Sequence, residues 1–180
     1  MRLIVCITGM PGSGKSTVAK ALNSSFRILS MGDVVRREAE RRGLEPSDVN
    51  LGAIMQELRK RYGLGAIAYL LVNEIKDGKD DIIIDGLRSI REAEILKGYG
   101  NVKILAIHTP KDKRLKFLVD RNRSDAPTSK EEFEIRDKRE LDVGVGEAIA
   151  YADAIITNDG SIEELQEKAR KIIRKWKEEC

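Results

Sequence analysis

The sequence predicts one α/β domain with three layers, in which helices cover both faces of a parallel β-sheet. Three observations support this fold class. Short runs rich in Ile, Val and Leu alternate with longer segments of helical periodicity, which is the pattern of repeated strand–helix–strand units. The run "DIIIDG" at 81–86 lacks polar alternation, so its strand is expected to be buried on both faces near the sheet centre. A glycine-rich stretch also separates the first apolar run from the first helical pattern.

The expected elements follow from these patterns. Strands are expected near residues 2–8, 26–30, 81–85, 102–108 and 154–157. Between the second and third strands, helical patterns cover 33–43, 48–62 and 66–77, which is more chain than a single crossover helix needs. After a helix that begins near Lys111, the polar stretch 121–140 is a candidate flap. The last helix has the clearest signal, because Ser161 and Glu164 have the spacing of a capping box and apolar residues follow at helical intervals.

Composition limits the classes of protein to which this chain can belong. Its 180 residues are enough for one buried core. The 33 Lys and Arg nearly balance the 30 Asp and Glu, and only 4% of residues are aromatic, so nucleic-acid binding is not favoured. No apolar run approaches the roughly 18 residues that span a bilayer. Cys6 and Cys180 have neither disulfide nor metal-site spacing, and the expected location is therefore cytoplasmic.

The glycine-rich stretch matches the phosphate-binding motif G-x-x-x-x-G-K-[ST], and it lies between a strand and a helix as this motif requires. Backbone N–H groups of such a loop, together with the N-terminus of the following helix, bind phosphate oxygens. Lys15 is the expected partner of the β- and γ-phosphates, Ser16 of Mg²⁺, and Thr17 of the α-phosphate. The predicted cofactors are therefore ATP and Mg²⁺, bound by a loop that comprises Gly9, Met10, Pro11, Gly12, Ser13, Gly14, Lys15, Ser16 and Thr17.

Charged residues follow the ends of the second and third predicted strands. Asp33 and Arg36 come after the second strand, and Asp85 and Arg88 come after the third. Since the carboxyl ends of parallel strands form the ligand crevice, these side chains are expected near the loop. Two arginines can bind an acceptor phosphate, while the carboxylates suit Mg²⁺ coordination through water. Two simpler hypotheses stay open: Arg88 forms a structural salt bridge, or Arg36 belongs to a helix that is basic on several sides.

These residues resemble the nucleoside monophosphate kinases, adenylate kinase above all. "SMGDVVR" at 30–36 is similar to the family's Ser/Thr-Gly-Asp-x-x-Arg stretch, with Met31 at the usual Thr position, and "DGLR" at 85–88 is similar to its Asp-Gly-x-x-Arg stretch, one residue shorter. The resemblance implies a P-loop NTPase fold with a five-stranded sheet of order 2-3-1-4-5. It also implies a single domain, 1–180, with an acceptor-binding insertion at 31–78 and a short lid at 121–140.

The same resemblance assigns roles to individual residues. It implies that Lys15 and Arg88 are catalytic, that the acceptor is bound by Gly32, Asp33, Arg36, Asp85, Gly86 and Arg88, and that Mg²⁺ is held by Ser16, Asp33 and Asp85. Arg121 and Arg123 resemble the arginines at the start of the family's lid and are expected to act in catalysis. Arg136 and Arg139 resemble those at its end, and a competing hypothesis makes them i, i+4 partners of Glu132 and Glu140 on a helix surface.

The stretch "ADAIITNDGS" at 152–161 is very similar to one in dephospho-coenzyme A kinases, where this loop borders the donor adenine. Asn158 and Gly160 are therefore candidate adenine contacts. The only histidine, His108, ends the fourth predicted strand and is expected to be structural. The whole chain resembles a group of archaeal proteins described as adenylate-kinase-related or dephospho-coenzyme-A-kinase-like.

These observations favour ATP-dependent phosphoryl transfer to a nucleoside monophosphate, with AMP as the leading acceptor. Two alternatives stay open. One is a kinase of another small molecule, with dephospho-coenzyme A the first candidate because of the C-terminal stretch. The other is a nucleotide-binding switch or weak ATPase that acts through a protein or RNA partner, which the basic segment "RREAERR" at 36–42 keeps open. No membrane partner or obligate protein partner is expected.

Overall fold

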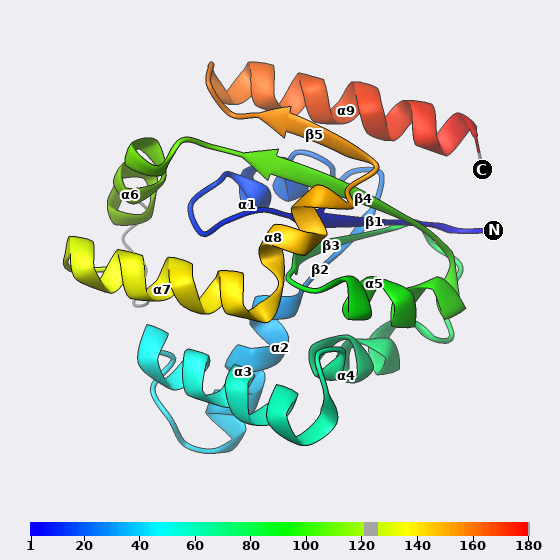
Figure 1. Ribbon diagram of the computed structural model, residues 1–180. Coiled ribbons are helices and arrows are strands. Elements are labelled where there is room, and N and C mark those ends of the chain that lie inside the picture. The colour runs from blue at the N-terminus through cyan, green and yellow to red at the C-terminus, as the bar shows by residue number, and fades with distance from the viewer. Residues whose placement is uncertain (121–125, 180) are drawn as a thin grey trace.

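A computed structural model gives the structure of residues 1–120 and 126–179 (Figure 1). In this part of the chain, five parallel strands form one sheet in the order β2-β3-β1-β4-β5, so the predicted order is confirmed. The strands are β1 (Leu3–Thr8), β2 (Arg27–Ser30), β3 (Ile82–Leu87), β4 (Asn101–His108) and β5 (Ala154–Thr157). β1 lies at the centre, between β3 and β4.

Helices connect the strands and cover both faces of the sheet. They are α1 (Lys15–Lys20), α2 (Met31–Arg41), α3 (Asp48–Tyr62), α4 (Ala66–Ile75), α5 (Ile90–Leu96), the short 3₁₀ turn η1 (Lys97–Tyr99), α6 (Lys111–Asp120), α7 (Lys130–Val143), α8 (Val145–Ala150) and α9 (Ile162–Glu178). Figure 1 shows α9 on one side of the sheet and α2 to α5 on the opposite side.

Side chains of the central strands alternate between two hydrophobic clusters, one on each face of the sheet. On one face, Val5 and Ile7 of β1 pack with α1 and α9, including the buried Trp176. On the other face, Cys6 of β1 and Ile84 of β3 pack with α2, α3, α4 and α5. This arrangement confirms the predicted three-layer architecture, and it places the buried thiol of Cys6 in an apolar cluster.

Serine side chains begin several of these helices. Ser30, Ser47, Ser129 and Ser161 each accept a hydrogen bond from a backbone N–H group in the first turn of α2, α3, α7 and α9. The capping box expected at Ser161 and Glu164 is confirmed. A second capping box, formed by Ser89 and Glu92, begins α5 directly after β3. These caps satisfy N–H groups that have no partner within the helix and fix where each helix begins.

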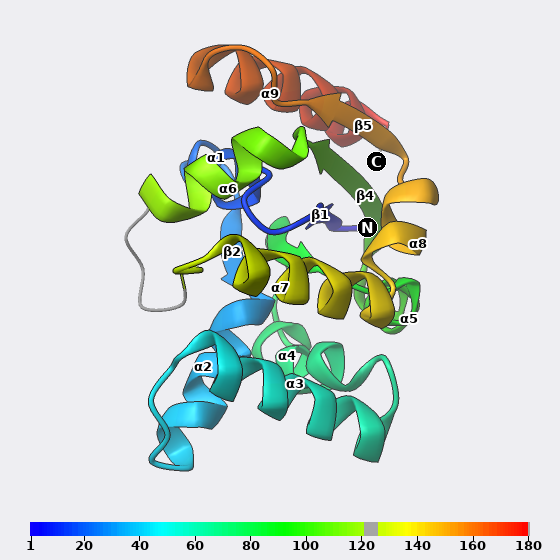
Figure 2. The same ribbon diagram turned by 60° about the vertical axis from the view of Figure 1, so that its left-hand side comes forward.

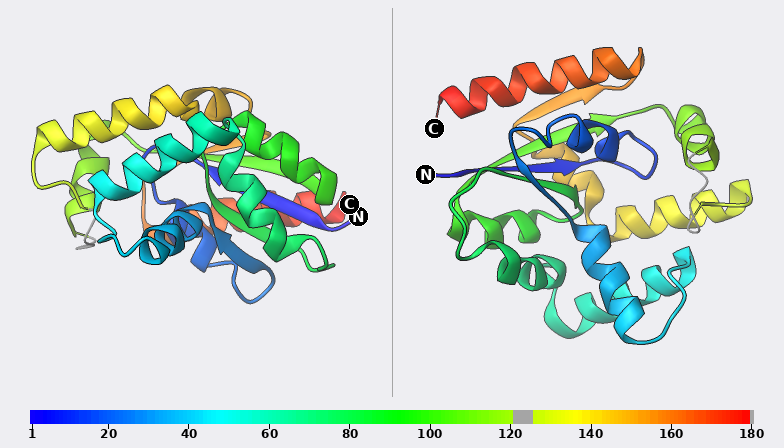
Figure 3. Two further views of the ribbon diagram at one scale, coloured as in Figure 1. Left: turned by 90° about the horizontal axis from the view of Figure 1, so that it is seen from below. Right: turned by 180° about the vertical axis from the view of Figure 1, so that it is seen from behind.

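The segment between β2 and β3 contains the predicted helices with small changes in their limits. α3 has the limits that the sequence predicts, whereas α2 begins at Met31 rather than at 33, because Ser30 ends β2 and caps the helix. α4 ends at Ile75, two residues earlier than expected. Figures 2 and 3 show that α3 lies beside α7, so this segment and the helix after the polar stretch face one another.

The polar stretch predicted as a flap is partly helical. α7 begins at Lys130 and continues past residue 140 to Val143, where α8 follows after a single glycine. Arg121 and Arg123 lie outside the described residues, so their predicted role stays a prediction. Among the residues that the structure describes, no helix is both long enough and apolar enough to cross a membrane.

Candidate functional site

The loop 9–14 links β1 to α1 and has a shape that a side chain on Gly12 would disrupt. Gly12 has a φ of 78°, and a Cβ at this position would lie 2.6 Å from the carbonyl oxygen of Arg114. Glycine is therefore required here both by the backbone conformation and by the close approach of α6. Gly12 lies at a variable position of the motif, so these two constraints, and not the motif itself, account for glycine there.

Three buried side chains from later in the sequence hold the carbonyl groups of this loop. Thr109 Oγ1 and Asn158 Nδ2 both donate to the carbonyl oxygen of Ser13, at 2.8 and 3.1 Å. The guanidinium of Arg114 donates to the carbonyl oxygen of Pro11 at 3.1 Å. Buried hydrogen bonds of this kind keep a loop in one conformation, so the phosphate-binding conformation is preformed.

Lys15 extends back along the loop at the start of α1. Its Nζ donates to the carbonyl oxygens of Gly9 at 2.8 Å and Met10 at 3.0 Å. The pKa of Lys15 is lowered from 10.5 to about 8, mainly by removal from water; the negative charge of Asp85 opposes this shift, and the positive charge of Arg88 adds to it. A phosphate group would supply the compensating charge that this ammonium lacks.

Ser16 and Asp85 form the polar pair expected for a metal. Because β1 and β3 are neighbours, Ser16 at the start of α1 faces Asp85 in β3, and its Oγ donates to Oδ2 of Asp85 at 2.7 Å. A hydroxyl and a carboxylate are ligand types that suit Mg²⁺, which keeps several waters and needs few protein ligands. The described residues contain no cluster of three or more acidic, histidine or cysteine side chains that would hold a metal by themselves. The pair thus fits an ion that arrives with a nucleotide.

A cavity of about 810 Å³ joins this loop to the helices that follow β2. Near the loop, apolar side chains of α6 and α9 line it, among them Phe117, Ile162 and Leu165. Leu51 and Met55 of α3 also line it, together with arginines from α2, from α7 and from the residue that follows β3. One continuous space therefore contains the phosphate-binding loop, apolar side chains and four arginines, of which Arg88 and Arg136 are near enough to Lys15 to lower its pKa.

Most of the predicted site residues line this cavity. They are Gly9, residues 11–17, Gly32, Arg36, Asp85, Gly86, Arg88, Asn158 and Gly160. Met10 and Asp33 are not among the lining residues. The side chain of Asp33 is 56% exposed and forms an ion pair with Arg36 at 2.8 Å, so its part in holding Mg²⁺ stays a prediction. Asn158 lines the cavity near the expected adenine position, and its side-chain amide also holds the loop.

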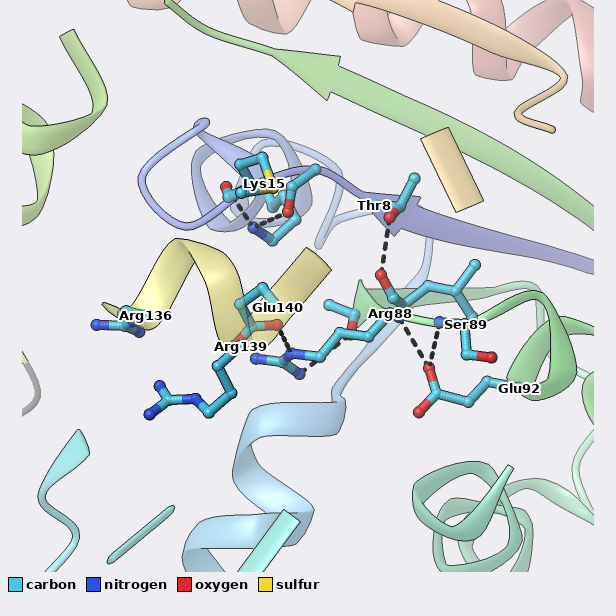
Figure 4. A network of polar contacts seen from close by, with 12 residues as sticks. Thr8, Lys15, Arg88, Ser89, Glu92, Arg136, Arg139 and Glu140 are labelled. Atoms are coloured by element: carbon cyan, nitrogen blue, oxygen red, sulfur yellow. Dashed lines mark hydrogen bonds and ion pairs between the residues drawn. The ribbon is translucent and has the colours of Figure 1, made fainter. Parts of the chain in front are cut away.

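Arg88 lines the cavity and also forms the salt bridge that the simpler hypothesis expected. Its Nε lies 2.6 Å from Oε2 of Glu140, whose side chain is only 4% exposed (Figure 4). Burial alone would raise the pKa of Glu140, but the Arg88 guanidinium holds this pKa below its ordinary value. The backbone N–H of Arg88 donates to Glu92, so the start of α5 fixes the arginine as well.

Arg136 and Arg139 project from α7 and line the cavity near α3 (Figure 4). Both lie close to Asp48 at the beginning of α3: Oδ1 of this carboxylate is 2.7 Å from Arg139 and 3.3 Å from Nε of Arg136. The competing hypothesis paired these arginines with Glu132 and Glu140. Glu140 instead pairs with Arg88, and the carboxylate of Glu132 accepts hydrogen bonds from the backbone and side chain of Thr128. The two arginines therefore link α7 to α3 and do not only form contacts within their own helix.

Several residues of the site were not found from the sequence. Asp137 of α7 accepts two hydrogen bonds from Arg114, at 2.8 and 2.6 Å, and so supports the arginine that holds the loop. Asp48 was likewise missed, and Glu140 was considered only as a partner of Arg136 and Arg139, not of Arg88. The sequence offers one weak signal: Asp137 and Glu140 are spaced so that both lie on one face of a helix.

The basic segment 36–42 is largely neutralised by acidic side chains within the described part of the chain. Arg41 and Arg42 both pair with Glu38, and Arg42 also pairs with Glu57 of α3. Arg37 forms an ion pair with Glu74 of α4. A surface whose positive charges already have partners gives little support to a nucleic-acid interface. His108 is exposed at the end of β4, and its carbonyl oxygen accepts a hydrogen bond from the backbone N–H of Asn158.

Comparison with known proteins agrees with this geometry. The model of a family described as an AAA domain matches residues 8–134. A UPF0200 protein of Aeropyrum pernix is 44% identical over 176 residues, which cover 96% of this chain and 93% of that protein. The crystal structure of TT1252 from Thermus thermophilus has a TM-score of 0.65 at 20% identity and covers 97% of both chains. A shikimate kinase from Acinetobacter baumannii, solved with shikimate, has a TM-score of 0.60 at 19% identity and covers 97% of this chain and 94% of that one. These two structures share the fold.

Proposed function

The chain belongs to the UPF0200 proteins and to the AAA-domain family, and from this premise we propose that it transfers the γ-phosphoryl group of Mg-ATP to a nucleoside monophosphate, with AMP as the first candidate acceptor. One observation carries the proposal. A single cavity is lined by the phosphate-binding loop, by the Ser16–Asp85 pair and by arginines from α2, from α7 and from the end of β3. Phosphoryl transfer needs this combination of positioning and positive charge, and it needs no protein nucleophile.

The donor is held at the loop. The loop and the N-terminus of α1 bind its phosphates, and Lys15 turns from the carbonyl oxygens of Gly9 and Met10 to the β- and γ-phosphates. Ser16 and Asp85 hold Mg²⁺, which neutralises charge on the phosphate oxygens. Phe117, Ile162 and Leu165 give the adenine an apolar surface, with Asn158 and Gly160 at its edge.

The acceptor is held by arginines that line the cavity. Arg36 and Arg88 bind its phosphate and direct one oxygen toward the γ-phosphorus, while Gly32 and Gly86 leave room for the approach. Val35, Leu51 and Met55 supply an apolar wall for its base. Under this proposal the segment 31–78 binds the acceptor and 121–140 is the lid, in which Arg121 and Arg123 join Arg136 and Arg139 around the transferred group. Closure excludes water and limits ATP hydrolysis.

AMP is preferred because "SMGDVVR" and "DGLR" resemble adenylate kinase and supply the two arginines that line the cavity. Dephospho-coenzyme A is the second candidate, since the stretch 152–161 resembles the kinases of that acceptor. A switch without transfer is less favoured, because the basic helix that supported it pairs with Glu38, Glu57 and Glu74.

Product analysis tests the proposal. The purified protein is incubated with Mg-ATP and, separately, AMP, CMP, UMP, GMP, dephospho-coenzyme A and shikimate, and the products are separated by anion-exchange chromatography. We expect ADP to form from AMP and ATP much faster than ATP is hydrolysed alone. Lys15→Ala should abolish transfer, and Lys171→Ala, which removes an exposed lysine of α9, should not. Phosphoryl transfer to another of these compounds would make that compound the proposed acceptor in place of AMP. ATP hydrolysis without transfer to any of them would contradict the proposal that the protein is a kinase.

A further inference from the structure

The carboxylate of Asp48 on α3 forms ion pairs with two arginines of α7. Asp48 begins α3, directly after the cap Ser47, and its Oδ1 lies 2.7 Å from Arg139 and 3.3 Å from Arg136. The side chains of Arg136 and Arg139 are 11% and 13% exposed, so both cations are largely removed from water. All three residues line the cavity. The contact therefore lies within the cavity, on the side where the acceptor is proposed to bind.

The guanidinium of Arg139 packs against α3 at Gly52, where a side chain would block it. A Cβ at Gly52 would lie 2.6 Å from one guanidinium nitrogen of Arg139 and 2.9 Å from its Cζ. Glycine is a poor helix former, and here it occupies the interior of α3 because the guanidinium lies directly against this turn. The approach of Arg139 to Asp48 is thus a packed contact rather than a loose surface pairing.

Arg136 and Arg139 share the carboxylate of Asp48. Asp85 is engaged by Ser16, and Glu140 is engaged by Arg88, so these two carboxylates serve other partners. Asp48 supplies one negative charge to two guanidinium groups, and both approach the same oxygen. Nε of Arg139 is buried without a hydrogen-bond partner among the described residues. A phosphate group, with two charges and three oxygens, offers these guanidinium groups more acceptor oxygens than the single Asp48 oxygen that they share.

We propose that Asp48 is a built-in competitor for the anion that Arg136 and Arg139 bind. Its carboxylate holds both guanidinium groups in place before the ligand arrives, and it must be displaced from them when a phosphate binds. Asp48 is thus a positioning residue that lowers the affinity for every anion at these two arginines and favours dianions over weaker ones. The identity of the natural anion, an acceptor phosphate, rests on the proposed function, whereas the competition itself does not.

Isothermal titration of the full chain with inorganic pyrophosphate tests this. Asp48→Asn keeps the shape of the side chain and removes its charge, and Asp48→Glu keeps the charge. Glu57→Gln is the matched control, because it removes one carboxylate from the same helix, where its partner is Arg42. We expect Asp48→Asn to lower the Kd for pyrophosphate about tenfold, a typical coupling between two sites, while the other two variants stay close to wild type. The same comparison in a Lys15→Ala background excludes a change at the phosphate-binding loop.

A variant without the two arginines distinguishes competition between Asp48 and the bound anion from a general effect of the protein's charge. In an Arg136→Gln, Arg139→Gln chain, Asp48→Asn should bring no gain in affinity, since the competed cations are gone. A gain there, unchanged or weaker binding by Asp48→Asn, undetectable binding in every variant, or an Asp48→Asn chain that does not fold would each overturn the proposal. Pyrophosphate binding needs no turnover, so a chain that shows the gain yet phosphorylates no acceptor would refute the proposed function alone.

Discussion

Arg88 at the end of β3 and Glu140 on α7 are 52 residues apart in sequence and share a hydrogen bond of 2.6 Å. This ion pair is the contact that joins α7 to the carboxyl end of the sheet beside Lys15. The two partners differ in exposure: the carboxylate of Glu140 is almost fully buried, while part of the Arg88 side chain lines the cavity. Arg88 can therefore be fixed by Glu140 and still face a ligand.

Removal of the charge at position 140 should destabilise the fold. Glu140→Gln leaves Arg88 largely buried without its counter-ion, and we expect the free energy of unfolding to fall by about 3 kcal/mol. Urea unfolding followed by circular dichroism measures this change. Glu94→Gln breaks the exposed pair with Arg91 and should be indistinguishable from wild type. Equal stabilities of the two variants would show that the Arg88–Glu140 pair contributes nothing.

The pair of Arg114 and Asp137 should couple the phosphate-binding loop to α7. Arg114 donates to the loop carbonyl of Pro11 and to both oxygens of Asp137, so either substitution disturbs the same network. A double-mutant cycle with Arg114→Lys and Asp137→Asn should give a coupling energy of about 2 kcal/mol in unfolding. In calorimetry, each single variant should also weaken ADP binding. Additive effects in the cycle would argue that the two residues act independently.

The lowered pKa of Lys15 predicts a pH dependence of nucleotide binding. Phosphate binding favours the charged ammonium, so affinity for ADP should fall as the pH rises through about 8, and binding near that pH should take up a proton. Titration calorimetry in two buffers with different ionisation enthalpies measures the uptake. Lys15→Arg keeps its charge throughout this range, and its affinity should not change with pH. Proton release by the wild type would contradict the prediction.

The same shift has a consequence for stability, and its sign is opposite to that of a favourable ion pair. The unfolded chain holds the lysine proton up to about 10.5, whereas the folded chain loses it near 8. Between these values the unfolded state binds more protons, so the Lys15 contribution to the free energy of unfolding rises with pH. Below about pH 8 the burial of the charged amine is a constant cost.

Alanine substitutions at two glycines, Gly12 and Gly43, distinguish the cost of backbone strain from the cost of a steric clash. Gly12 and Gly43 both have a positive φ, 78° and 68°, but a Cβ at Gly43 would meet no atom within 4 Å. Gly43→Ala should therefore cost about 1 kcal/mol of stability from strain alone. Gly12→Ala adds the clash with the carbonyl of Arg114, and we expect a loss of about 3 kcal/mol together with weaker ADP binding. Thermal or urea unfolding compares them, and similar losses would show that the loop can move aside.

The sheet and the phosphate-binding loop were predictable because their signals are local. The apolar run of β3 and the spacing of Lys15 within the motif need only a few neighbouring residues. The proximity of Ser16 and Asp85 followed from one rule, that the carboxyl ends of parallel strands share an edge. Strand order came from the family resemblance, since no local pattern specifies which strands are neighbours.

The partners of the arginines were not predictable in this way. Asp48 has the position of an ordinary first-turn acid, which stabilises the helix N-terminus by itself, and nothing nearby in the sequence indicates Arg139. Asn158 lines the cavity, but its hydrogen bond to Ser13 depends on the packing of β5 beside β4 and has no local signal in the sequence. The orientation of α7, which decides what Asp137 and Glu140 contact, is a property of the assembled tertiary structure.

The side-chain hydrogen bonds that hold the phosphate-binding loop also affect when the site is completed during folding. The side chains that hold its carbonyl groups follow the motif by about a hundred residues or more: they are Thr109, Arg114 and Asn158. Contacts of such long sequence separation form late, because loop closure must precede them. A nascent chain that ends before β5 therefore carries the complete motif without its full support. Ligand binding by the loop is a marker of finished folding, and it can be used to time the maturation of the chain.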